Sequence, residues 1–147
     1  MNIIEAVRAL LAEFPRISEV CNAVHVDFAE PNPDSYALSS TGDALVNEDV
    51  LGNQRRQHNF VLYTMWQSAS DFDRLNNAGI LLELTYWLER HGKERKIAGV
   101  IDGVAYPGEI TKLTCSNGML MAIPPELNGG VQYQLQIAAE YKINMED

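Results

Sequence analysis

Histidine, cysteine and serine are the residue types in this chain that could bind a metal ion or act as nucleophiles, and their spacing forms no familiar motif. His25, His58 and His91 lie far apart, and neither a His-x-x-x-His nor a Cys-x-x-Cys pair occurs, although metal sites commonly use such close spacings. No serine has the sequence context of a nucleophile elbow, and no glycine-rich phosphate-binding loop is present. The sequence therefore predicts no catalytic, metal or cofactor site, and we expect no enzyme.

A long strand and the helix after it must position most of the remaining candidates. Residues 56–66 alternate so that both strand faces are apolar, with Phe60, Leu62, Thr64 and Trp66 on one face and Val61, Tyr63 and Met65 on the other. The helix runs from a cap at Ser70 or Asp71 to Gly92, and it has two apolar stripes: Ile80, Leu81, Leu84, Trp87 and Leu88, and then Leu75, Ala78, Leu82 and Tyr86. Because a surface helix buries only one stripe, we expect a neighbouring molecule to cover the second.

The same region resembles a known family. The chain carries Arg56-Gln57 before an aromatic strand, followed by Asn77-Ala78-Gly79, Leu82-Glu83 and Tyr86-Trp87-Leu88-Glu89. This order is similar to that of the tail terminator proteins of long-tailed bacteriophages, which are often labelled minor capsid proteins. The resemblance extends over residues 36–141 and is densest over residues 55–89. Two departures are Ile80, where the family would have an aromatic ring, and the His58-Asn59 pair before Phe60.

The resemblance implies a structural virion protein with no catalytic residue and no cofactor. It implies a hexameric ring that caps the tail tube, stops its growth and provides the surface to which the filled head attaches. The implied partners are other copies of this chain, the tail tube protein and a head-completion protein, while genomic DNA only passes through the channel and no membrane is involved. The implied location is the tail of the virion, and the host cytoplasm during assembly.

The residues expected to contact other subunits or the tube are chosen on physical grounds. Exposed apolar patches and unpaired charges are where subunits meet. The chosen residues are Leu75, Leu82 and Tyr86 of the second stripe, the loop from Thr41 to Asn53, and the basic residues Arg55, Arg56, Arg90 and Lys93.

Charge and composition limit the other functions. The chain has a net charge of −9, although residues 51–100 hold five acidic and seven basic side chains, so sequence-specific DNA recognition is not expected. No basic leader precedes an apolar run, and no stretch stays apolar for the roughly 18 residues of a membrane span. We expect a cytosolic, soluble protein that forms a single domain over residues 1–147, with Cys21 and Cys115 as free thiols.

The periodicity of the chain predicts an α+β fold of two layers, in which two α-helices cover a mainly antiparallel or mixed β-sheet. The first helix is expected to begin at Asn2, with Glu5 completing a capping box, and to stop at Pro15. A strand over residues 24–28 is expected to pair antiparallel with a strand that starts at Tyr36.

The later elements are predicted with different clarity. Residues 41–53 are expected to form a loop or a loosely paired hairpin, and a linker is expected through Gly99, Gly103 and Pro107-Gly108. Residues 109–123 are expected to form one strand, or two strands broken near Asn117-Gly118. The final strand, residues 131–141, alternates cleanly between an apolar and a polar face.

Two alternative functions stay open. One is a small bacterial enzyme or ligand-binding α+β domain, with a pocket between sheet and helices lined by Tyr63, Trp66 and Trp87. The other is a neighbouring phage head-completion or adaptor protein. Gene position separates the first alternative from a tail terminator, whose gene should lie among genes for head completion and the tail tube.

Overall fold

The computed structural model of the chain describes residues 1–15, 24–26, 35–66, 71–122 and 131–145, and it describes side chains for residues 1–15, 38–63, 79–116 and 134–145. Within these residues the helices are α1 (Ile3–Ala12) and α3 (Asp71–His91). The strands are β1 (Val24–Val26), β2 (Ser35–Glu48), β3 (Gln54–Trp66), β4 (Lys96–Ile101), β5 (Val104–Ala122) and β6 (Val131–Ile143).

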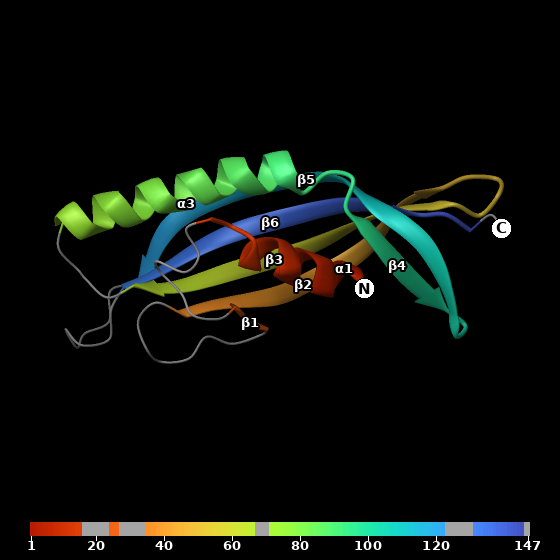
Figure 1. Ribbon diagram of the computed structural model, residues 1–147, viewed down its shortest axis with the longest axis horizontal. Coiled ribbons are helices and arrows are strands. Elements are labelled where there is room, and N and C mark those ends of the chain that lie inside the picture. The colour runs from red at the N-terminus through yellow and green to blue at the C-terminus, as the bar shows by residue number, and fades with distance from the viewer. Residues whose placement is uncertain (16–23, 27–34, 67–70, 123–130, 146–147) are drawn as a thin grey trace.

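These strands form one curled sheet in the order β1-β2-β3-β6-β5-β4, and each neighbouring pair is antiparallel except β1 with β2. Helix α3 runs alongside β5, and α1 contacts β4 and β1 (Figure 1). Side chains of both helices belong to one core cluster with one face of the sheet. The predicted α+β class is confirmed.

The core lies between the helices and one face of the sheet. On β6, Leu135, Ile137 and Ala139 are buried while Gln136 is exposed, which confirms the predicted alternation of the final strand. On α3, the buried residues are Ile80, Leu81, Leu84 and Leu88, so the first predicted stripe is the one that faces the sheet.

Helix α1 begins as its sequence predicts. The Asn2 side chain accepts a hydrogen bond from the Glu5 amide at 2.9 Å, and the Glu5 carboxylate accepts one from the Asn2 amide at 3.3 Å. This reciprocal pair satisfies two amides that have no partner inside the helix. The helix then buries Val7, Leu10 and Leu11.

Helix α3 ends at His91, and Gly92 explains how closely it packs on the sheet. A Cβ atom at Gly92 would lie 2.8 Å from the Leu113 Cβ atom of β5, which is too close for any other residue type. After the helix, the residue that takes a left-handed backbone is Glu94, with φ of 66°, and not Gly92. The predicted helix end is confirmed, and the glycine serves close packing.

Two sheet predictions were wrong. Strand β1 pairs parallel with β2, Val24 lying opposite Tyr36, and not antiparallel; the connecting residues 27–34 lie outside the described residues. The predicted linker around Gly99 and Gly103 is instead the β4–β5 hairpin. Asp102 and Gly103 form its turn with φ of 52° and 79°, the pair of positive values that a tight type I′ hairpin turn requires.

The two open predictions are now resolved. Residues 41–53 belong to a paired β2–β3 hairpin, whose register shifts at Ser40/Gly42 and again at Leu45/Asn47. The Asp49 carboxylate holds the turn by accepting from the amides of Leu51 at 2.9 Å and Asn53 at 3.0 Å. Strand β5 is continuous, although its register against β6 shifts between Ser116 and Met119, where the sequence suggested a break.

Candidate functional site

The second apolar stripe of α3 is exposed where its side chains are described. The sequence predicted that the fold would bury only one of the two stripes. Leu82 and Tyr86 are 51% and 62% exposed, on the side of the helix away from Leu84 and Leu88. Arg90 and Lys93 are also exposed and continue this line toward the end of the helix. We call Leu82, Tyr86, Arg90 and Lys93 the α3 stripe. Leu75 lies in α3, but its side chain is outside the described residues.

The tip of the β2–β3 hairpin is a second exposed apolar surface. It carries Leu45, Val46, Val50 and Leu51, and Val50 is 101% exposed. Figure 1 shows this hairpin projecting beyond both helices, at the end of the molecule where the described chain terminates. Glu48 and Asp49 lie beside these apolar residues, so the tip is acidic as well as apolar. We call residues 45–51 the hairpin tip.

A third exposed apolar site was missed from the sequence. Val100 and Val104 flank the turn of the β4–β5 hairpin and are 69% and 51% exposed. Figure 1 shows this hairpin bending away from the β2–β3 hairpin. The signal that could have found it is Asp102-Gly103 between apolar residues, a strong short-range indication of a hairpin.

The four predicted basic contact residues differ in their surroundings. Arg55, Arg90 and Lys93 are exposed. Arg56 is partly buried, and its guanidinium donates hydrogen bonds to Asp43 at 2.7 Å and to Gln54 at 3.0 Å. Arg56 is therefore engaged within the chain, whereas the side chains of the other three extend into solvent.

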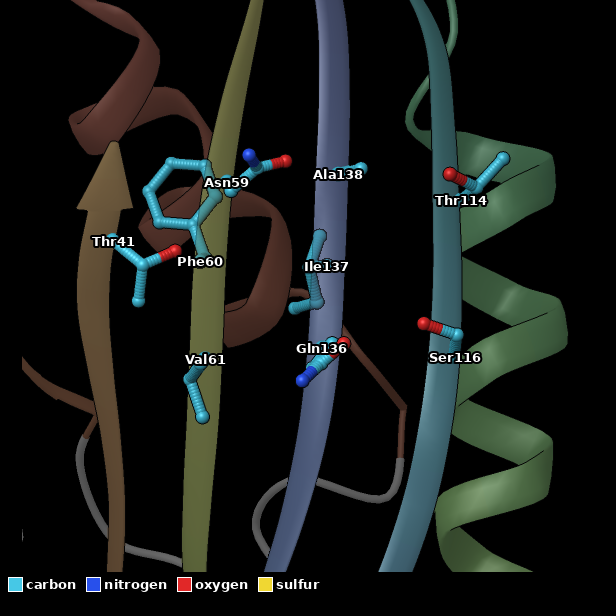
Figure 2. A pocket seen from close by; sticks show the side chains of 9 residues that line it. All are labelled: Thr41, Asn59, Phe60, Val61, Thr114, Ser116, Gln136, Ile137 and Ala138. Atoms are coloured by element: carbon cyan, nitrogen blue, oxygen red, sulfur yellow. The ribbon is translucent and has the colours of Figure 1, made fainter. Parts of the chain in front are cut away.

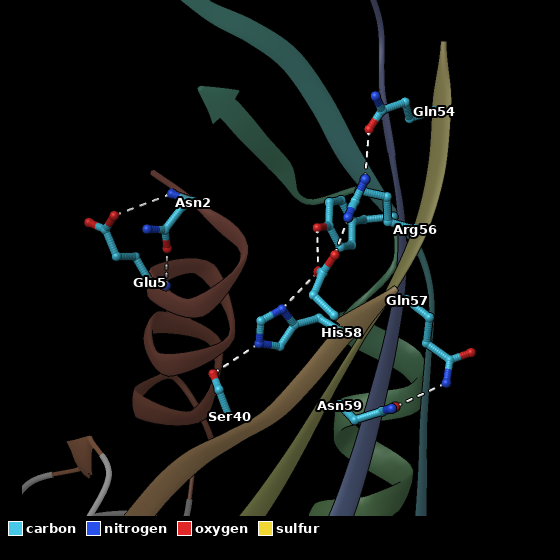
Figure 3. Close-up of polar contacts among 10 residues, drawn as sticks. Asn2, Glu5, Ser40, Gln54, Arg56, Gln57, His58 and Asn59 are labelled. Carbon is cyan, nitrogen blue, oxygen red and sulfur yellow. Dashed lines mark hydrogen bonds and ion pairs between the residues drawn. The ribbon is translucent and has the colours of Figure 1, made fainter. Parts of the chain in front are cut away.

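A polar cluster lies on the helix-covered side of β2, β3 and β6, and no sequence motif indicated it. His58 is buried, and its Nδ1 lies 2.9 Å from the Asp43 carboxylate while its Nε2 lies 2.9 Å from the Ser40 hydroxyl. Tyr141 donates its hydroxyl to the same Asp43 oxygen at 2.5 Å. Figure 3 shows Ser40, His58 and Arg56 drawn together by these bonds. The cluster joins residues nearly a hundred positions apart, so local spacing could not reveal it.

The charges in this cluster follow from its hydrogen bonds. Burial opposes the ionisation of Asp43, but hydrogen bonds from Tyr141, Arg56 and His58 outweigh burial and lower the pKa of the carboxyl group below its usual 3.8. Burial and the hydrogen bond to Asp43 raise the pKa of Tyr141, so its hydroxyl stays protonated and donates. An ionised Asp43 can only accept a hydrogen bond, so His58 Nδ1 is the donor of this pair. In the tautomer that carries its only proton on Nδ1, His58 Nε2 accepts a hydrogen bond from the Ser40 hydroxyl.

The opposite face of the sheet is hollowed, and polar and apolar side chains line the hollow together. A hollow of about 390 Å³ lies over β2, β3, β6 and β5, and its lining includes Thr41, Asn59, Thr114, Ser116 and Gln136. Figure 2 shows that these side chains come from four adjacent strands. The pocket expected between sheet and helices would have used Trp87, but Trp87 is half-buried and packs edge-on against Phe14, with ring centroids 5.7 Å apart. The side chain of Trp66 is outside the described residues.

Cys115 is a free thiol, half-buried in β5. Burial, with a contribution from the Glu89 carboxylate, raises the pKa of this thiol to about 12. Cys21 lies outside the described residues. Among the described residues, no group of three or more histidine, cysteine or acidic side chains could hold a metal ion, and neither helix offers a stretch long and apolar enough to cross a membrane.

Comparisons with known proteins identify no family for this chain. No protein-family model matches it, and no curated protein matches it.

Proposed function

We propose that this chain is a structural protein of the bacteriophage tail, a tail terminator that caps the tail tube as a ring and provides the head-joining surface. The observation that carries the proposal is the placement of exposed apolar side chains on two separate surfaces, the α3 stripe and the hairpin tip. The sequence resemblance over residues 36–141 supports the same function independently of this placement.

Exposed apolar residues at these two places contribute little to the fold of an isolated chain. The core is already closed beneath α3, where Leu84 and Leu88 are fully buried, and the hairpin tip projects past the helices that cover the sheet (Figure 1). Exposed apolar side chains that are grouped in this way favour a site that another protein covers. We infer that it is covered in the assembled state.

Two different surfaces on one subunit favour head-to-tail association. When one patch of each subunit contacts a different patch of the next, the contact is heterologous, and it generates a ring if the rotation closes. The charges support this pairing: Arg90 and Lys93 extend the α3 stripe, while Glu48 and Asp49 accompany the hairpin tip. We propose that the tip of one subunit docks on the α3 stripe of its neighbour.

The net charge of −9 suits a ring through which DNA passes. An acidic body repels phosphate groups, so the duplex would gain no strong, sequence-specific contact that holds it in place. Duplex binding is accordingly expected to be weak and independent of sequence.

The proposal is tested by mixing two damaged chains. A tip variant (Val50→Asp with Leu51→Asp) and a stripe variant (Leu82→Asp with Tyr86→Ser) each lack one half of the interface, so each alone should be a folded monomer. Mixed in equal amounts, they retain one intact interface and should form a dimer by light scattering, whereas the unmodified chain forms closed rings that cap tail tubes. Lys112→Asp, at an exposed position on neither surface, is the control and should leave rings intact.

This function would be rejected by an unmodified chain that stays monomeric at all concentrations and does not bind tail tubes. Rings that persist in both variants would reject the docking of the hairpin tip on the α3 stripe and would place the interface elsewhere. A chain that forms rings but joins to heads and never to tubes would instead be the head-completion or adaptor protein that the sequence left open.

The ligand-binding alternative has less support. The expected aromatic pocket is not formed by Trp87, whose ring packs on Phe14. The hollow over the outer sheet face has a mixed lining, in which hydroxyl and amide groups are as prominent as apolar side chains such as Val61 and Ile137. Small-molecule sites are usually lined by apolar side chains with only a few polar groups. The outer face is therefore a weaker candidate than the two apolar surfaces.

A further inference from the structure

We propose that Ser40 is an activated nucleophile, a modification site that takes an acyl or phosphonyl group from small activated donors, with His58 as the base and Asp43 as the positioning residue. This inference is independent of the tail function. It is based on the hydrogen bonds that link Ser40, His58 and Asp43 (Figure 3), and it does not depend on whether the chain assembles into a ring of subunits.

The geometry is that of a hydroxyl, an imidazole and a carboxylate in line. The Ser40 hydroxyl lies 2.9 Å from His58 Nε2, and His58 Nδ1 lies 2.9 Å from Asp43. A nucleophile in hydrogen-bond contact with a base, which a third group orients in turn, is the arrangement that activates serine in unrelated folds. Ser40 itself is exposed while His58 is buried, so a reagent can reach the hydroxyl and water is kept from most of the imidazole.

The imidazole is held in the orientation that the reaction needs. Phe60 contacts the His58 ring with centroids 4.5 Å apart and planes inclined at 34°. The Asp43 carboxylate is itself fixed by Arg56 at 2.7 Å and Tyr141 at 2.5 Å. Phe60 and Asp43 together hold the orientation of the ring, and with Nδ1 donating to Asp43 the tautomer that leaves Nε2 unprotonated can accept the Ser40 hydroxyl proton.

The same contacts also limit the rate. Arg56 and Tyr141 also donate hydrogen bonds to the Asp43 carboxylate. Because these bonds partly neutralise its charge, the carboxylate stabilises an imidazolium at His58 less than it would without them. We therefore assign to Ser40 a reaction with donors that have a good leaving group, such as aryl esters, thioesters or phosphonofluoridates, and not the hydrolysis of amides.

The chemical step is a simple group transfer. The Ser40 oxygen bonds to the acyl carbon of an aryl ester as the bond from that carbon to the aryl oxygen breaks. The hydroxyl proton passes to His58 Nε2 and then to the departing phenolate, giving an ester at Ser40 and a phenol. With a phosphonofluoridate the phosphorus–fluorine bond breaks instead, and the proton leaves with fluoride.

A fluorophosphonate probe with peptide mapping tests this inference on the intact chain of residues 1–147. We expect the adduct on Ser40, its loss in Ser40→Ala, and labelling of Ser40 that is at least about tenfold slower in Asp43→Asn and in His58→Gln, because positioned bases typically contribute factors of roughly 10² to 10⁴. Ser116, an exposed serine on the outer face of the same sheet, is the internal control and should not be labelled. Melting curves establish that each variant is folded.

If a variant fails to fold, the inference is still tested by labelling the unmodified chain with and without urea. Labelling of Ser40 must disappear in urea, because the hydrogen-bond chain exists only in the fold. The inference is overturned by the absence of an adduct under conditions that fully label a serine hydrolase, by equal labelling of Ser40 and Ser116, or by labelling that survives urea. Folded Asp43→Asn and His58→Gln variants that react at the original rate would overturn it equally.

Discussion

Two leucines on α3 allow a direct measurement of which side of the helix holds the fold together. Leu84 is 0% exposed and belongs to the core, whereas Leu82, two positions earlier on the same helix, is about half exposed. Leu84→Ala leaves a cavity and should lower the free energy of unfolding by about 2–5 kcal/mol. Leu82→Ala makes the same chemical change at an exposed position and should alter it by less than about 0.5 kcal/mol.

The assays are urea unfolding, which gives the free energy of unfolding, and thermal melting, both followed by circular dichroism at low protein concentration. For a chain of this size, each kcal/mol corresponds to a melting shift of roughly 2–4 °C, so Leu84→Ala should melt some 4–20 °C lower while Leu82→Ala stays near the original chain. Equal losses for both substitutions would refute the assignment of the two stripes. If Leu82→Ala lowers the melting temperature only at high concentration, the lost stability belongs to association with a second copy, because such stabilisation follows mass action.

The remaining predictions concern single groups. Cys115, with its pKa raised to about 12, should react slowly with a thiol reagent at pH 8 in the folded chain and at an ordinary rate in urea; equal rates by peptide mapping would contradict its burial. Because folding lowers the pKa of Asp43 from 3.8, its ionised form stabilises the fold above that value, and this contribution is lost as the pH falls through the lower folded pKa. Asp43→Asn should therefore lower the melting temperature at pH 7, and the gap should narrow below about pH 3.8; a gap that is constant with pH would contradict the shift. A Cβ atom at Gly108 would lie 2.2 Å from the Lys142 carbonyl oxygen, so Gly108→Ala should lower the free energy of unfolding by about 1–3 kcal/mol. Gly79→Ala, at an exposed helix position with open space, should instead raise it by about 0.5–1 kcal/mol. A Gly108→Ala variant that melts higher than Gly79→Ala would contradict the close approach of β5 to β6.

The elements that were predicted well are those whose signals are local. The capping box at Asn2 and Glu5 depends on residues three positions apart, and the face of β6 depends on strict alternation. The buried stripe of α3 repeats at helical spacing, so one pass along the sequence finds it. Each of these signals is complete within a single element, and none needs knowledge of what lies across the sheet.

The missed features depend on contacts between distant segments, or on a turn signal that lies among residues typical of a linker. The glycines and Pro107 around the β4–β5 hairpin suggested a linker, although the Asp102-Gly103 turn was present between apolar residues. The short alternating pattern of β1 predicts a strand but does not specify the direction in which it pairs with β2. The cluster around His58 needs Tyr141 from β6 beside Asp43 from β2, and no spacing in the sequence encodes that approach.

The exposed apolar surfaces are better explained by a partner than by the fold of one chain. Below α3, the core is closed by Leu84 and Leu88, so Leu82 and Tyr86 could be polar without cost to the isolated fold. The length of the β2–β3 hairpin leads to the same conclusion. Its strands of 14 and 13 residues extend past the helices (Figure 1), and Val50 at its turn is fully exposed to solvent. A hairpin longer than its covering layer gains no core from its outer residues. We infer that both surfaces were shaped by contacts between molecules, which is why the mixing of tip and stripe variants is the decisive experiment.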